Sequence, residues 1–161
     1  MNEASEIREA LERARTVAIV GCSPNPDRPS HEIARYLMAA GYRIIPVNPG
    51  HREILGQTCY RSLAEIPREI RLDIVDVFRR SSEVAPTARQ AVARGVGFFF
   101  MQQGVVDPES ARQLEEAGIP VAMDRCIAVE HGRLGLARNR NSPAEPRVSV
   151  LARGEPPAKE E

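Results

Sequence analysis

The sequence has no excess charge of either sign, almost no lysine and no long apolar run. Its 161 residues hold 22 Lys and Arg against 22 Asp and Glu, so no overall field would draw the chain to nucleic acid or to an anionic membrane. We therefore expect neither partner. Lys159 is the only lysine, and the other 21 of these basic residues are arginine.

A signal peptide and metal-type spacings are missing as well. Three cysteines and the absence of a secretory leader fit a reducing environment, and we expect a soluble, cytoplasmic protein. His31, His51 and His131 are scattered, and no Cys/His cluster has zinc spacing. We expect no metal.

One stretch, 16–41, organises the rest of the chain. Residues 17–20 are apolar and fit a buried strand, residues 21–28 form an irregular loop broken by glycine and prolines, and a helix follows from Pro29 and Ser30. Unpaired amide groups and the dipole at such a helix start favour an anion, and Ser23 and Arg28 lie beside it. The alternative is an ordinary strand-to-helix turn; we favour a phosphate site.

Strands and helices alternate along the remaining chain, which predicts a single α/β domain with a doubly wound five-stranded parallel sheet. The expected strands are 17–20, 42–47, 73–78, 97–101 and 119–123, and the expected helices are 30–41, 63–66, 81–94 (capped by Ser81 or Ser82) and 107–117. We expect the third strand to lie outside the second, in the order 3-2-1-4-5. An amphipathic helix at 1–15 should pack on the edge of the 16–133 domain, and 134–161 should be a disordered tail.

The usual signature of a redox dinucleotide site is missing from the strand ends. The first turn has no G-x-G-x-x-G, and the second strand ends in Asn48 where an acidic residue would bind a ribose. Arginines at 28, 52, 79, 80 and 125 stand near the strand ends instead. Several guanidinium groups around one cleft suit a ligand with more than one phosphate.

Six segments, in order, resemble the small stand-alone CoA-binding family, which is related to the nucleotide-binding domain of the succinyl-CoA synthetase α subunit. They are GCSPNPDRPSHEIARYL, GYRIIPVNPG, EILGQTCYRSLAEIP, DIVDVFRR, MQQGVV and VAMDRCIAVE, and they span about 16–131. The resemblance implies a Rossmann-like fold and coenzyme A as the ligand.

The resemblance also implies site residues. The loop Gly21, Cys22, Ser23 and Pro24, with Arg28, Pro29 and Ser30, would hold phosphates, and Asn48 and Pro49 would border the adenosine part. Val77, Phe78, Arg79, Arg80, Gln103, Gly104 and Val105 would line the adenine and pantetheine path. Arg125 and Cys126 would lie towards the thiol end.

A catalytic set is not evident in the sequence. No Ser-His-Asp or Cys-His arrangement is apparent, His131 falls at the expected frayed end of the domain, and Asp73 and Asp76 flank a strand where a structural role is typical. We expect a non-catalytic CoA or acyl-CoA carrier, sensor or regulatory module. The alternatives are the CoA-binding subunit of a two-component acyl-CoA ligase and, less favoured, an NADP-binding oxidoreductase fragment.

Two cysteines could react with the CoA thiol. Cys22 precedes a helix start near Arg28, an environment that lowers a thiol pKa, although a buried cysteine is usually a small apolar residue. Cys126 is the candidate for a mixed disulfide with CoA.

Overall fold

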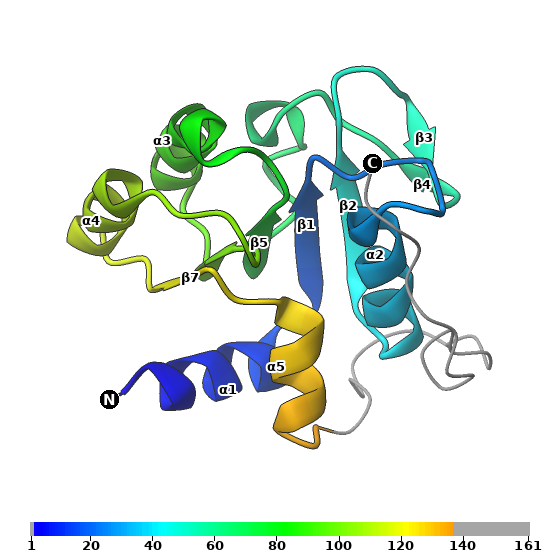
Figure 1. The fold of residues 1–161 in the computed structure, drawn as a ribbon. Helices are drawn as coiled ribbons and strands as arrows, with labels where there is room; N and C mark the ends of the chain where they lie inside the picture. The colour runs from blue at the N-terminus through cyan, green and yellow to red at the C-terminus, as the bar shows by residue number, and fades with distance from the viewer. Residues whose placement is uncertain (1, 137–161) are drawn as a thin grey trace.

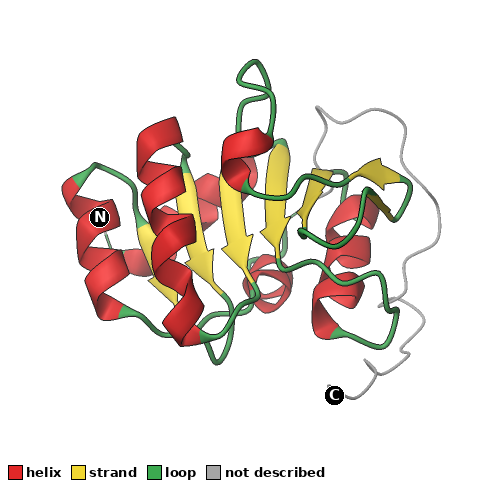
Figure 2. Cartoon of the chain, turned by 90° about the horizontal axis from the view of Figure 1, so that it is seen from above, coloured by secondary structure: helices red, strands yellow, loops and turns green. Residues whose placement is uncertain are grey.

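The computed structural model describes residues 2–136, which form a five-stranded parallel sheet covered by helices on both faces (Figures 1 and 2). The strands of this sheet are β1 (Thr16–Val20), β2 (Arg43–Val47), β5 (Ile74–Val77), β6 (Phe98–Met101) and β7 (Val121–Met123). The predicted Rossmann-like α/β fold is confirmed. Most of the predicted tail, from residue 137 onward, lies outside the described residues.

The helices and the small hairpin connect these strands. The helices are α1 (Glu3–Arg13), α2 (Pro29–Ala39), α3 (Val84–Arg94), α4 (Pro108–Glu116) and α5 (Ile127–Arg133), with single 3-10 turns η1 (Leu63–Glu65) and η2 (Ser81–Glu83) and the hairpin β3 (Glu53–Ile54) and β4 (Gln57–Thr58). Within residues 2–136, no helix has the length and apolar character needed to cross a bilayer.

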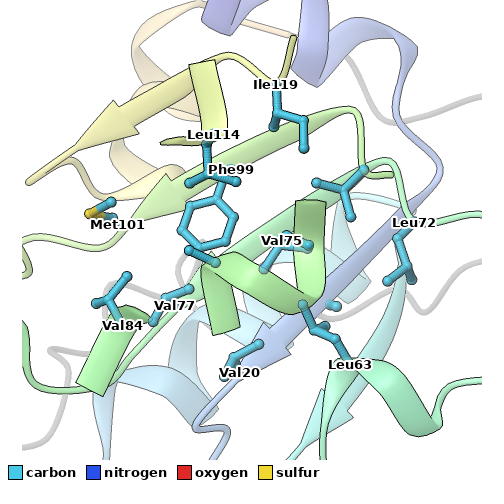
Figure 3. Close-up of a cluster of buried hydrophobic side chains, with 14 of the residues drawn as sticks. Val20, Leu63, Leu72, Val75, Val77, Val84, Phe99, Met101, Leu114 and Ile119 are labelled. Carbon is cyan, nitrogen blue, oxygen red and sulfur yellow. The ribbon is translucent and has the colours of Figure 1, made fainter. Parts of the chain in front are cut away.

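Two apolar clusters lie on the two faces of the sheet. Val75 and Phe99 pack with Leu114 beneath α3 and α4 (Figure 3), and Ile74 packs on the opposite face with α1, α2 and α5. Strand residues alternate between the faces, and both faces are covered, so most residues of the strands are apolar. Helix α1 buries Ile7 in the second cluster, so it lies over a face of the sheet and not at its edge.

The predicted strand order was wrong. The order is β2-β1-β5-β6-β7, so the third strand of the main sheet pairs with the first and not with the second. The outer edge of β2 is occupied by Tyr60, whose N–H donates to the Pro46 carbonyl at 3.1 Å and whose carbonyl accepts from the Asn48 N–H at 2.8 Å. That edge is unavailable to β5, which crosses over and pairs beside β1.

Two local predictions also need correction. The side chains of Ser81 and Ser82 do not cap the helix that follows them; the Ser81 hydroxyl accepts from the Val106 N–H at 2.8 Å and so ties two loops together. Helix α5 was not predicted, and it places His131 in the interior, with only 5% of its surface exposed, so this residue is not at a frayed end.

Candidate functional site

A cleft of about 1090 Å³ opens at the carboxyl ends of the strands. It lies where β1 continues into α2 on one face of the sheet and β5 continues into α3 on the other. In doubly wound folds, ligands bind at this switch point. The cleft brings together many of the residues predicted from the sequence: Gly21, Ser23, Arg28, Pro29, Ser30, Phe78, Arg79, Arg80, Gln103, Val105 and Cys126.

The turn after β1 uses its own amide groups. The N–H groups of Gly21 and Cys22 donate to the Val47 carbonyl at 2.8 and 3.3 Å. The N–H of Ser23 donates to the Ser30 hydroxyl at 2.9 Å. These bonds hold the loop against β2 and α2. They also mean that all three amides already donate to protein acceptors and are not free to bind an anion.

The amide groups at the start of α2 are used by the chain in a similar way. Pro29, the first helical residue, has no N–H, and the His31 N–H donates to the Arg28 carbonyl at 3.1 Å. The His31 ring lies with Nδ1 2.9 Å from the Ser23 carbonyl. The expected supply of unpaired amide groups is therefore largely used by the chain itself. An anion here must be held mainly by side chains, with help from the α2 dipole.

Arginine supplies the positive charge of the cleft. Arg28 precedes α2, Arg79 and Arg80 follow β5, and Arg133 ends α5. Arg28 and Arg79 are half-buried, where a guanidinium is screened less than at an open surface. We call the part of the cleft formed by the loop 21–30 and residues 78–80 its charged end.

The opposite part of the cleft lies between α2 and α5, and we call it the apolar arm. Its apolar lining comes from Ile33 and Tyr36 of α2 and from Ala128 and Val129 of α5, and the same two helices also contribute Glu32 and Arg133 to the cleft wall. The Tyr36 hydroxyl lies 2.8 Å from Nδ1 of His131 and so joins the two helices. Burial lowers the pKa of His131, which favours the neutral ring in this contact.

Some of the predicted site residues do not line the cleft: Cys22, Pro24, Asn48, Pro49, Val77, Gly104 and Arg125. Val77 is fully buried in the core on the α3 side. The Asn48 side chain donates to the Cys22 carbonyl at 2.8 Å, and the Gly104 N–H donates to Asp124 at 2.7 Å, so both support loops.

Arg125 and Cys22 make contacts that support the fold. Arg125 forms ion pairs with Glu3 at 2.7 Å and with Glu130 at 3.5 Å, which link α1 to α5. Cys22 is fully buried in the apolar cluster on the α2 face. Burial, reinforced by Cys59 nearby, raises the pKa of Cys22 to about 12. The expected lowering of this thiol pKa was wrong, because the side chain points into the core.

Other residues of the cleft were not predicted from the sequence: Glu32, Ile33, Tyr36, Gln102, Ala128, Val129, Gly132 and Arg133. A usable signal exists for α2, because Pro29, Ile33 and Tyr36 recur at helical spacing and so share a face with the loop. Helix α5 has only seven residues, too few for a clear periodic pattern.

A buried carboxyl group lies behind the cleft. Asp76 of β5 is fully buried, and burial raises its pKa well above the ordinary value. Gln102, which lines the cleft, faces it; turned with its amide nitrogen towards Asp76, Gln102 donates to both carboxyl oxygens at 3.2 Å. Asp73, by contrast, accepts from the Arg15 and Thr16 amides at 2.9 and 3.1 Å and has the structural role expected of it.

Residues 15–132 match the model of the CoA binding domain family. The chain belongs to this family. It is also 44% identical over 127 residues to the uncharacterized protein YneT of Bacillus subtilis (strain 168), and the match covers 79% of this chain and 93% of YneT. A solved structure of Thermus thermophilus, cell-free ID.343, is 40% identical with a TM-score of 0.77 and covers 83% of this chain and 99% of that one.

The family extends to domains of larger enzymes. An ADP-forming acetate–CoA ligase of Archaeoglobus fulgidus is 25% identical over 157 residues, which are 89% of this chain but 22% of the ligase. The CoA-binding resemblance noted in the sequence is thereby confirmed at the level of the family. The chain corresponds to one domain-sized part of that ligase.

Proposed function

We propose that the chain binds coenzyme A, or an acyl-CoA, in the cleft between β1 and β5 and acts as a non-catalytic carrier, sensor or regulatory module. The observation that carries this proposal is the cleft's two-part character. Its charged end holds Arg28, Arg79 and Arg80, and its apolar arm extends between α2 and α5. CoA has the matching form, with phosphates on the nucleotide and a long uncharged pantetheine arm.

The size of the cleft supports a ligand of this class. Pockets for drug-sized molecules usually measure about 300–1,000 Å³. The volume here, about 1090 Å³, lies just above that range and suits an extended ligand. The charged end would account for phosphate recognition, because Arg28, Arg79 and Arg80 line it.

The titratable groups near the cleft support binding more than catalysis. His31 is engaged with the Ser23 carbonyl and His131 with Tyr36, so neither ring is presented to the cleft as a ready base or phosphoryl acceptor. Among residues 2–136, no group of three or more His, Cys, Asp or Glu is placed to hold a metal ion. The contacts of His31 with Ser23 and of His131 with Tyr36 give both histidines a structural role.

Titration calorimetry tests the proposal. CoA should bind more tightly than dephospho-CoA and much more tightly than pantetheine, and raising the salt concentration should weaken CoA binding because exposed charge contacts are screened. NADP should bind weakly, since the first turn lacks the dinucleotide glycines. Equal affinity for CoA and pantetheine would contradict phosphate-driven binding.

A second candidate is the CoA-binding subunit of a two-component acyl-CoA ligase. It is favoured by a relative named as the alpha subunit of an ADP-forming acetate–CoA ligase of Pyrococcus furiosus, 34% identical over 64 residues. The two candidate functions are separated by measuring the ADP released from ATP in the presence of acetate and CoA. We expect no turnover by the chain alone or mixed with an ATP-binding ligase subunit; turnover only in the mixture would favour the ligase role.

A further inference from the structure

Glu32 is a buried acidic residue that the proposed phosphate contacts leave unexplained. It lies in the first turn of α2 and borders the cleft, yet only 9% of its surface is exposed. Its Oε2 atom is enclosed and has no hydrogen-bond partner within the described part of the chain. A buried polar atom without a partner is costly and calls for an explanation.

Two other buried or half-buried acidic groups among residues 2–136 have partners. Glu130, 8% exposed, forms ion pairs with Arg125 at 3.5 Å and with Arg133 at 3.4 Å. Asp73 accepts two backbone amides. The fold therefore satisfies carboxylates where they serve only the structure, and Glu32 differs from them.

Within residues 2–136, no protein group donates a hydrogen bond to Glu32 Oε2. Ile33 is next to it on α2, and Tyr36, one turn further along the helix, directs its hydroxyl to His131. Ala128 and Val129 form the facing wall of the apolar arm. Because Glu32 borders the cleft, a ligand bound there could supply its carboxylate with a donor.

We propose that Glu32 recognises the N–H and O–H donors of the pantetheine arm and fixes the direction in which the ligand lies. This inference rests on the proposed function and adds a specificity-determining residue to it. Phosphate oxygens are negatively charged acceptors, so Glu32 repels them. The amide and hydroxyl groups of pantetheine are donors, and a carboxylate accepts from them strongly.

The orientation of the ligand in the cleft follows from these two kinds of contact, between arginine and phosphate and between Glu32 and the pantetheine donors. The phosphates lie at the charged end, with Arg79 and Arg80. The pantetheine arm passes Glu32 and runs along α2 towards Tyr36, a distance of roughly 6 Å at 1.5 Å of rise per residue. The thiol end then reaches the part of the cleft wall that holds Cys126.

Two substitutions and two ligands test the inference. Glu32→Met removes the acceptor at similar volume, and Glu32→Gln keeps one acceptor oxygen without the charge. Calorimetry should show that Glu32→Met weakens CoA binding about tenfold, the loss expected for a charge-assisted hydrogen bond. Phospho-ADP, the nucleotide part of CoA, should bind the variant as it binds the wild type or more tightly. Glu32→Gln should lose less CoA affinity than Glu32→Met.

Thermal melting without ligand supplies a readout that a structural role would move in the opposite direction. Glu32→Met should melt at or above the wild-type temperature, because it removes a buried group without a partner. The matched control Glu130→Met should melt lower, because it leaves Arg125 and Arg133 without their shared carboxylate.

The outcomes separate this inference from the function on which it rests. If wild-type protein binds CoA and Glu32→Met loses equal affinity for CoA and phospho-ADP, or loses none for either, the role given to Glu32 is wrong and the function stands. If wild-type protein binds neither ligand, the proposed function fails and the inference fails with it. A clear fall in melting temperature for Glu32→Met would show that the carboxylate serves the fold.

Discussion

A Cβ atom on Gly21 would collide with the carbonyl oxygen of Phe78. The two segments are pinned together at this point, since the Phe78 N–H donates to the Val20 carbonyl at 2.8 Å. Gly21 also has φ of +85°, which disfavours any other residue. The approach of β5 to β1 is therefore sufficient to require glycine at this position.

This relationship predicts that Gly21→Ala lowers the stability of the ligand-free protein as well as its CoA affinity. Gly104 is a matched control, because its φ is +89° but nothing lies within 4 Å of its Cβ position. We expect Gly104→Ala to cost about 1 kcal/mol from backbone strain, and Gly21→Ala to cost clearly more. Chemical denaturation measures both, and equal losses would show that the contact with Phe78 relaxes easily.

The position of the cleft could be predicted from the sequence, because its signals are local. The apolar run 17–20, the glycine after it and the proline at the start of α2 are adjacent in the chain, and each restricts the backbone directly. The strand ends then meet at one edge of any parallel sheet. For this reason the loops 21–30, 78–80 and 103–105 could be placed together even with the wrong strand order.

The features that could not be predicted depend on contacts between distant residues. The strand order depends on Tyr60, which occupies the outer edge of β2. The Cys22 thiol lies near a helix start in the sequence, but the strand before it turns the side chain into the core. Glu32 looks like an ordinary first-turn acidic residue in the sequence, and its burial beside the cleft is seen only in the folded chain.

The arginines of the charged end should dominate CoA affinity. Arg28→Ala should weaken CoA binding by about 1.5–3 kcal/mol if its guanidinium makes a charge-assisted bond to phosphate. Arg71→Ala is the control, because Arg71 pairs with Asp73 and does not line the cleft. The loss from Arg28→Ala should be smaller for pantetheine than for CoA. A similar loss from both variants would indicate a general charge effect.

The stability of the protein should fall as the pH falls below about 6.5, the ordinary pKa of histidine. Burial lowers the pKa of His131 in the folded protein, so the unfolded chain binds a proton that the folded chain excludes. The stabilising contribution is complete above the unfolded pKa and is lost as the pH falls towards the folded one. His131→Asn should flatten the decline in melting temperature between pH 7 and 5.5, whereas substitution of the exposed His51 should not. An unchanged slope for His131→Asn would assign the decline to other groups.

Cys126 should be the cysteine that reacts with a CoA disulfide. It is partly exposed and lines the cleft, whereas Cys22 is fully buried and burial raises the pKa of Cys59 as well. The Cys126 thiolate would attack one sulfur of the disulfide, forming a protein–CoA mixed disulfide and releasing one CoA thiol. Peptide mass mapping should locate the adduct at Cys126, and Cys126→Ser should abolish it.

The rate of this exchange tests whether the thiol end of bound CoA lies near Cys126. Binding in the cleft would place the disulfide beside the thiol and raise its effective concentration, so CoA disulfide should react faster than glutathione disulfide. Phospho-ADP should slow the reaction of CoA disulfide, because it competes for the charged end. If glutathione disulfide reacts equally fast and phospho-ADP has no effect, Cys126 is simply an accessible thiol, and the ligand does not bring its sulfur to this part of the cleft.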